Sequence, residues 1–273
     1  MDPGTGLTIL GSAVGGAKLV EKILGPTAEY LGNGIRTWTE NRVKNVARVF
    51  QKAQVKLGDR IQADGAVPPR VLKEVLDNGS FCDDELTAEY FGGVLASSRT
   101  PNGRDDRGAT YLRLTSDLSS YQIRFHYVCY FWFREHFVGS GLRTTFTDDL
   151  EKMRLFLPSS FVRLAMDFSS MEPVAEILLH CTSGLDRQDL LETDAWGEAK
   201  HLNELGKKMG WRTVTQQGFV VWPTQFGLDY FLWAIGAGQF HRGRFLDVEL
   251  SLPKLPEIAF QGQPTKLIDA PRA

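Results

Sequence analysis

The chain has 273 residues, a formal net charge of −2, and 42% hydrophobic against 23% charged residues. These values exclude a disordered chain, and a chain of this length can bury a core without a structural metal or disulfides. The near-neutral balance also excludes a global attraction to nucleic acid or acidic lipid, so any such contact requires a local basic surface.

Residues 1–25 are expected to form an apolar, glycine-rich helix. The apolar stretch 7–24 is interrupted by Lys18 and lacks the composition of a membrane span. Small residues four apart within it let two helices approach closely. We favour an amphipathic helix packed on the rest of the chain, and the alternative is a segment that enters membranes or self-associates. The glycines that would serve this alternative are Gly11, Gly15 and Gly16.

Residues 26–145 are predicted to form a helical domain that opens with a long helix, from Pro26 to about Ile61. Apolar residues recur along it at helical spacing, and proline suits a first helical position. Its polar face carries a stripe of cations with few acids set against it. A solvated face is the favoured interpretation, and contact with a partner or nucleic acid is the alternative. The candidate contact residues on this stripe are Arg42, Arg48, Lys52 and Lys56.

Two shorter helices are expected next, in RVLKEVLDN after Pro69 and in the segment that follows CDDEL. The three acids of CDDEL are explained by the favourable interaction of negative charge with a helix N-terminus. A metal or acid–base site is the less favoured alternative.

A polar loop, TPNGRDDRG, precedes a short helix over 109–117, and a longer helix follows over 121–137. Aromatic residues occupy nearly every side of the longer helix, which predicts burial in the centre of a domain. His126 on this helix is interpreted as a hydrogen-bonded core residue rather than a ligand.

Residues 146–170 are predicted to be a connector containing a helix capped at Thr147, and residues 171–240 a winged-helix-like domain. The pattern is three helices, in MEPVAEILLHCTSG, LDRQDLLE and DAWGEAKHLNELGKKMGW, then a hairpin around Gln216–Gly218 and a last helix from Pro223 or Thr224. Asp194 is the expected N-cap of the third helix. Residues 241–273 are expected to be an extended, proline-containing tail.

The third helix of this domain is the expected recognition helix. A DNA-reading helix needs cations and amides facing the groove, with basic neighbours for phosphates. This helix carries acids as well, so its charge is nearly balanced, and contact with a protein is favoured over nucleic acid. Its candidate contact residues are Lys200, Lys207 and Lys208.

No catalytic motif is apparent in the sequence. It contains no phosphate-binding GxxxxGK[ST], no HExxH and no GxSxG. Glu135 and His136 are adjacent on a helix and therefore point about 100° apart, which is poor geometry for a shared site. Cys129 lies among aromatic residues, where burial makes a thiol inert. We therefore predict no enzyme, no catalytic residue and no cofactor.

The three cysteines, Cys82, Cys129 and Cys181, are odd in number and far apart in the sequence. This is not a disulfide framework, and it favours a reducing compartment, so a cytoplasmic protein is expected. Only His180 and Cys181 stand side by side, and two adjacent ligands do not close a tetrahedral site, so no metal site is predicted.

Four segments together resemble one bacterial family: ILGPTAEYLG, RVKNVARVFQKAQ, VPPRVLKEVLDNGSFCDDELTAEYFGGVLASSRT and GFVVWPTQFGLDYF. The chain resembles the abortive-infection alpha family over residues 25–236, and most specifically over 68–100. It differs in having Tyr90, Phe91 and Gly92 where many members carry a Trp-Ala pair. The resemblance implies a role in defence against bacteriophage, in which the infected cell stops growing or dies, and it carries over no catalytic residues.

The sequence thus predicts a mainly α protein, with a helical N-terminal bundle that has a long first helix and a winged-helix-like C-terminal domain. The favoured function is phage defence through macromolecular contacts, with a protein partner or self-association. One alternative is a membrane-perturbing effector that uses residues 7–24 and associates with a membrane on activation. The other is a winged-helix DNA-binding regulator.

Overall fold

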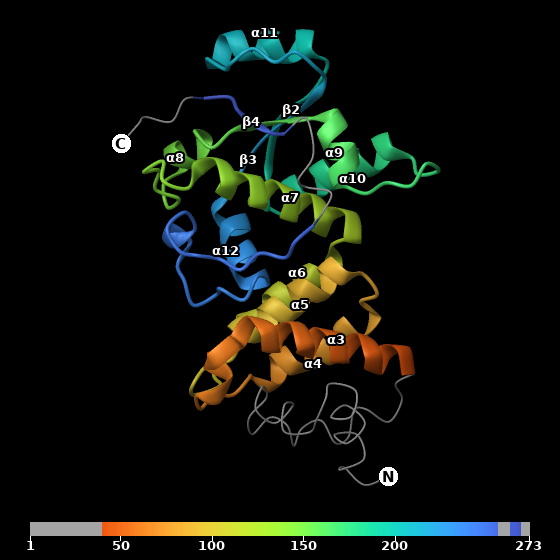
Figure 1. The fold of residues 1–273 in the computed structure, drawn as a ribbon, viewed down its shortest axis with the longest axis vertical. Helices are drawn as coiled ribbons and strands as arrows, with labels where there is room; N and C mark the ends of the chain where they lie inside the picture. Colours follow the sequence, from red (N-terminus) through yellow and green to blue (C-terminus); the bar gives the residue numbers. More distant parts are fainter. Residues whose placement is uncertain (1–39, 256–262, 269–273) are drawn as a thin grey trace. The chain divides into compact units, whose positions relative to one another are not determined.

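The computed structural model describes residues 40–255 and 263–268 of the chain (Figure 1). This part is mainly helical with one small antiparallel sheet of four strands, which confirms the predicted mainly α class. Within it, one compact unit comprises residues 40–120 with 232–239, and a second comprises the remainder. The break at Ser120 lies before the predicted boundary at 145, and the break after Gln239 lies beside the predicted boundary at 240. The predicted glycine-rich helix, with Gly11, Gly15 and Gly16, lies outside the described residues.

The first unit is a group of helices around one apolar core. In chain order they are α3 (Glu40–Leu57), the 3₁₀ turn η3 (Gly58–Gln62), α4 (Pro69–Asp77), the 3₁₀ turn η4 (Gly79–Phe81), α5 (Glu85–Ser97) and α6 (Gly108–Asp117). The predicted helices that correspond to α4, α5 and α6 are confirmed. Side chains with no exposed area in this core include Val46, Val49, Phe50, Val71, Leu72, Val75, Val94, Leu95 and Leu112.

Helix α5 begins as its acidic N-terminal sequence predicts. The Asp84 carboxylate accepts a hydrogen bond from the Thr87 backbone N–H at 2.7 Å and another from the Thr87 hydroxyl at 2.7 Å. An N-cap of this kind satisfies a donor that the helix itself cannot, and it places negative charge at the positive end of the helix dipole. The interpretation of the CDDEL acids as helix-terminus residues is therefore confirmed for Asp84.

Two adjacent glycines let the backbone of α5 approach its neighbours on both sides. A Cβ atom at Gly92 would lie 2.5 Å from Lys52 Cβ and 2.9 Å from the Val49 carbonyl oxygen, both on α3. A Cβ atom at Gly93 would lie only 1.7 Å from the Ala234 carbonyl oxygen. Because backbone atoms cannot move away singly, α5 tolerates no side chain at these positions.

We expect Gly93→Ala to lower the free energy of unfolding by about 3 kcal/mol, because overpacking against backbone forces the helices apart. Urea denaturation of the full chain measures this. Gly79→Ala is the control, since its Cβ would meet its nearest neighbour, Phe91 Cδ1, at an ordinary 3.4 Å. Equal stability of the two variants would contradict the close approach at Gly93.

The second unit is built around α7 (Ser120–Phe137), and the predicted burial of this helix is confirmed. Eleven of its residues are buried, and His126 has no exposed area. The His126 ring lies 4.4 Å from that of Tyr130 and 5.1 Å from that of Tyr230. Burial lowers the pKa of His126 to about 3, so the ring is neutral and acts as a core residue, as predicted.

A four-stranded sheet in the order β2-β3-β1-β4 belongs to the second unit. The strands are β1 (Leu155–Pro158), β2 (Glu192–Gly197), β3 (Gly218–Trp222) and β4 (Thr265–Lys266). All three pairings are antiparallel, and the β2–β3 register shifts between Thr193 and Ala195, where β2 carries a bulge or irregularity. The helices around the sheet are α8 (Thr147–Glu151), α9 (Ser159–Ala165), α10 (Val174–Arg187), α11 (Ala199–Met209) and α12 (Gln225–Ala234), with the 3₁₀ turn η5 (Arg242–Arg244).

Several predictions for this region were wrong. The predicted helix in TDDLEKMRLFLP ends at Glu151, and the buried run Leu155–Pro158 is a strand, so the predicted connector contributes to the sheet. A separate helix in LDRQDLLE does not form, because α10 continues to Arg187.

The predicted hairpin around Gln216–Gly218 does not form either, because only β3 is a strand there and its partners are β1 and β2. Asp194, the predicted N-cap, lies in β2, and Glu198 takes the position before α11. The tail is not simply extended, since Phe245, Leu246 and Val248 are buried and β4 pairs with β1. Periodicity in single segments does not reveal such pairing between distant segments.

Candidate functional site

The arginines of the predicted basic stripe on α3 turn toward the segment that precedes α5. Arg42 Nε donates to Ser80 Oγ at 3.1 Å, and its guanidinium stacks 4.3 Å above the Phe81 ring. Arg48 Nη1 donates to the Asp83 carbonyl oxygen at 2.9 Å. Both guanidinium groups therefore fix the loop that leads into α5.

The lysines of the stripe form ion pairs with α5. Lys52 pairs with Glu85 and lies 2.7 Å from Glu89 Oε1, and Lys56 Nζ lies 2.8 Å from Glu89 Oε2. Burial lowers the pKa of Lys56. Although burial would raise the pKa of Glu89, the adjacent Lys56 and Lys52 hold that pKa below its usual value. The stripe is thus an ion-pair network between two helices rather than a solvated face.

We expect Glu89→Gln to destabilise the chain at neutral pH by about 2 kcal/mol, because it leaves Lys56 buried beside a neutral group. The carboxylate stabilises the fold above its ordinary pKa, and this stabilisation is lost as the pH falls through the lower folded value. The difference between wild type and variant should therefore shrink below about pH 4.

Urea denaturation at pH 7 and pH 3 tests this, with Glu85→Gln as the matched control. The Glu85 side chain is 67% exposed, so its loss should cost less than about 1 kcal/mol. A constant difference between wild type and Glu89→Gln across this pH range would contradict the ionic role of Glu89.

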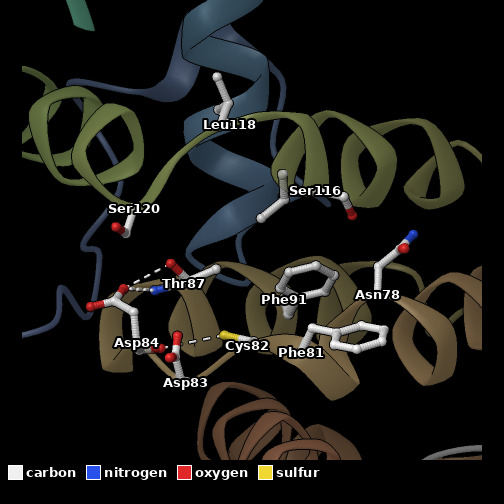
Figure 2. Close-up of a pocket in the computed structure, with 11 residues that line it drawn as sticks. Asn78, Phe81, Cys82, Asp83, Asp84, Thr87, Phe91, Ser116, Leu118 and Ser120 are labelled. Atoms are coloured by element: carbon white, nitrogen blue, oxygen red, sulfur yellow. Dashed lines mark hydrogen bonds between the residues drawn. The ribbon is translucent and has the colours of Figure 1, made fainter. Parts of the chain in front are cut away.

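A small cavity of about 370 Å³ lies beside the start of α5 (Figure 2). Figure 2 shows Phe81 and Phe91 on one side and the hydroxyls of Ser116 and Ser120 across from them. The Asp84 carboxylate in this lining accepts the two hydrogen bonds from Thr87 at the N-cap of α5. The cavity therefore offers hydroxyl groups, carboxylates and an aromatic wall. Its lining residues are Asn78, Phe81, Cys82, Asp83, Asp84, Thr87, Phe91, Thr115, Ser116, Leu118 and Ser120.

The Cys82 thiol in this cavity is not a nucleophile. Its Sγ donates to the Asp84 carbonyl oxygen at 3.3 Å, and burial together with the nearby Asp84 raises its pKa to about 12. Burial also raises the pKa of Cys181 to about 12 and that of Cys129 well above its usual value. Since the thiolate is the reactive form, all three thiols are inert at neutral pH, as predicted for Cys129.

We expect the folded chain to show no reaction with a disulfide reagent at pH 8, because no thiol is exposed or ionised there. All three thiols should react once guanidinium unfolds the chain. Absorbance of the released aromatic thiol measures both states. Reaction of one thiol in the folded chain at the rate of free cysteine would contradict the raised pKa values.

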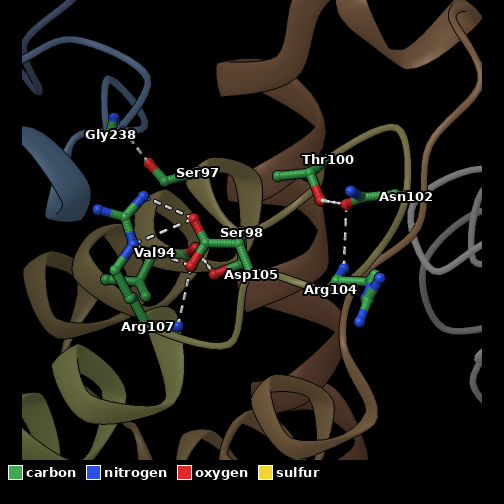
Figure 3. A network of polar contacts seen from close by, with 9 residues as sticks. All are labelled: Val94, Ser97, Ser98, Thr100, Asn102, Arg104, Asp105, Arg107 and Gly238. Atoms are coloured by element: carbon green, nitrogen blue, oxygen red, sulfur yellow. Dashed lines mark hydrogen bonds and ion pairs between the residues drawn. The ribbon is translucent and has the colours of Figure 1, made fainter.

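The polar loop between α5 and α6 forms a local network (Figure 3). Arg107 Nη2 lies 2.6 Å from Asp105 Oδ2, and Asn102 Oδ1 accepts from the Arg104 backbone N–H at 3.2 Å. Asp106 pairs with Arg70 at 3.2 Å. These contacts hold the loop together before α6 and tie it to α4.

The predicted contact lysines of α11 are fully on the surface. Lys200, Lys207 and Lys208 are exposed, and none of them has an ion-pair partner in the described part of the chain. Lys207 and Lys208 occupy the last turn, where cations interact well with the helix dipole. Close by, Trp196 and Met209 are 40% and 52% exposed.

A larger cavity of about 990 Å³ lies along α7 in the second unit, and no sequence pattern indicated it. Side chains of α7, among them Trp132 and Glu135, form one wall, and residues from 249 to 255 with Gln263 form another. His136 does not face a shared site with Glu135, because its Nε2 lies 2.8 Å from the Pro264 carbonyl oxygen. The intervening residues 256–262 lie outside the described part.

The described residues lack both a metal-binding cluster and a membrane-spanning helix. They contain no group of three or more His, Cys, Asp and Glu side chains arranged to hold a metal ion. Within the same ranges, no helix combines the length and apolar character needed to cross a membrane.

Comparison of the chain with protein-family models, curated proteins and solved structures found no match in any of the three. The resemblance to the abortive-infection alpha family therefore stays a prediction from the quoted segments.

Proposed function

We propose that the chain binds a protein partner through its second unit and acts by that contact in defence against bacteriophage. The observation that supports this most directly is apolar exposure on three consecutive segments. Leu164 on α9 is 52% exposed, Met171 in the following loop 93%, and Leu179 on α10 53%. Single exposed apolar residues are ordinary, but large ones on a helix, a loop and the next helix are typical of a docking surface.

The order of elements supports a winged-helix-like interpretation of this unit. Strand β1 is followed by α9, α10 and β2, and β3 returns to pair with both β1 and β2. In a winged helix the helices and strands follow each other in this order, and the last of the three strands in the chain lies in the middle of the sheet. In that interpretation α10 takes the place of the recognition helix, and α11, which the sequence suggested for this role, lies in the wing between β2 and β3.

The exposed face of α10 favours protein over nucleic acid. A helix that reads DNA presents cations and amides, and affinity comes largely from phosphate contacts. Two acids are exposed on α10, an exposed apolar side chain lies between them, and one exposed cation lies at the end of the helix. The exposed residues of this face are Ala175, Glu176, Leu179, His180, Ser183, Asp186 and Arg187.

The defence role rests on the resemblance of the quoted segments. A host that expresses the chain should give fewer phage plaques than the same host with an empty vector. Equal plaque counts across a broad panel of phages would contradict the defence role.

The docking surface is tested by Leu179→Asp in the same assay. A charge placed in an apolar contact should cost about 2 kcal/mol of binding, roughly thirtyfold in affinity, and should reduce protection. Val55→Asp is the matched control, because Val55 is 78% exposed on α3 of the first unit. Circular dichroism melting confirms that both variants fold. Full protection by Leu179→Asp would contradict a docking role for α10.

A further inference from the structure

We propose that the partner bound by the second unit is a second copy of the chain, placed head to tail, with α10 of one copy against α11 of the next. This inference rests on the docking role proposed for α10. It is drawn from the exposed faces of two helices whose charges are opposite in sign, one of which also carries an exposed leucine.

The α10 face and the residues just after it carry negative charge. Between 174 and 192 there are four carboxylates and one guanidinium, that of Arg187. Asp189 is exposed beyond the end of the helix, and Leu179 stands between the acids Glu176 and Asp186 on the same face. Burial and the nearby carboxylates of Asp186, Asp189 and Asp194 raise the pKa of Glu192.

The α11 face carries positive charge and has few internal contacts. Only Leu202 and Gly206 of this helix are buried, so most of its surface faces outward (Figure 1). Met209 in the last turn is also exposed, but it points about 100° from Lys208 and about 160° from Lys207 around the helix, so it lies off the lysine face. The exposed cations of the helix are Lys200, Lys207 and Lys208, set against the exposed acids Glu204 on the helix and Glu198 just before it.

The two faces do not neutralise each other within one copy. Strand β2 lies between the two helices in the chain, with α10 before its start and α11 after its end. Its six extended residues span roughly 17 Å. That span exceeds the screening length of about 8 Å at physiological salt.

Oppositely charged faces on one molecule favour a heterologous contact, in which each copy uses a different surface. Such a contact leaves one free face at each end, so assemblies grow with concentration until they close into a ring. Leu179 supplies an apolar contact at the centre of the α10 face. The charges set the orientation and make association sensitive to salt.

Sedimentation velocity of the full chain tests this with a pair of charge reversals. Glu176→Lys with Asp186→Lys makes both faces basic, and Lys207→Glu with Lys208→Glu makes both acidic. Each variant alone should associate at least about thirtyfold more weakly than wild type. An equal mixture of the two should associate again, because each presents the charge that the other lacks. Lys44→Glu, on an exposed lysine of α3, is the control and should behave as wild type.

Recovery in the mixture cannot arise from misfolding, so it supports the pairing specifically. A wild-type chain that stays monomeric at high concentration and low salt overturns the proposal. So does unchanged association of both variants, or a mixture that fails to recover.

The outcomes also separate this proposal from the proposed function. If wild type is monomeric while Leu179→Asp loses phage protection, the partner is another protein and the docking role stands. If copies associate through α10 and α11 while Leu179→Asp still protects, the link between docking and defence fails.

Discussion

The close approach of α5 to its neighbours is the constraint on which the first unit depends. With Gly92 against α3 and Gly93 against the end of α12, the backbone of one helix serves as part of the packing surface for two others. Such contact leaves no room for side chains to adjust, so the position of α5 is set by backbone sterics. The lysine–glutamate network lies along the same α3–α5 interface and is therefore held in one geometry.

This arrangement explains why charge on α3 is not evidence of a binding surface. A cationic stripe indicates phosphate contact only if it faces solvent, and the acids that neutralise this one lie more than thirty residues later in the chain. Helices α10 and α11 of the second unit also carry exposed charge. There it accompanies exposed apolar side chains, a combination that suits a protein contact better than a structural role.

The sequence predicted elements well where each is set by local rules, and poorly where partners are distant. Pro69 at the start of α4 and the aromatic content of α7 each predict a helix from nearby residues alone. By contrast, the short apolar run Leu155–Pro158 is compatible with either a helix or a strand. It is a strand because it pairs with Gly218–Trp222, which is distant in the sequence. The exposure of Leu164 and Met171 also depends on tertiary packing, so no periodicity revealed that surface.

The shape of the sheet also bears on how copies can join. Strand β4 pairs with β1 on one side of the sheet, and β2 is the edge strand on the other side. The unpaired backbone groups of an edge strand can pair with a strand from another molecule. The register shift between Thr193 and Ala195 twists that edge, and Asp194, at the irregularity, is tied to Arg154. An irregular, charged margin resists extension of the sheet by a neighbouring strand. Any association between copies would then have to use surfaces other than this edge of the sheet.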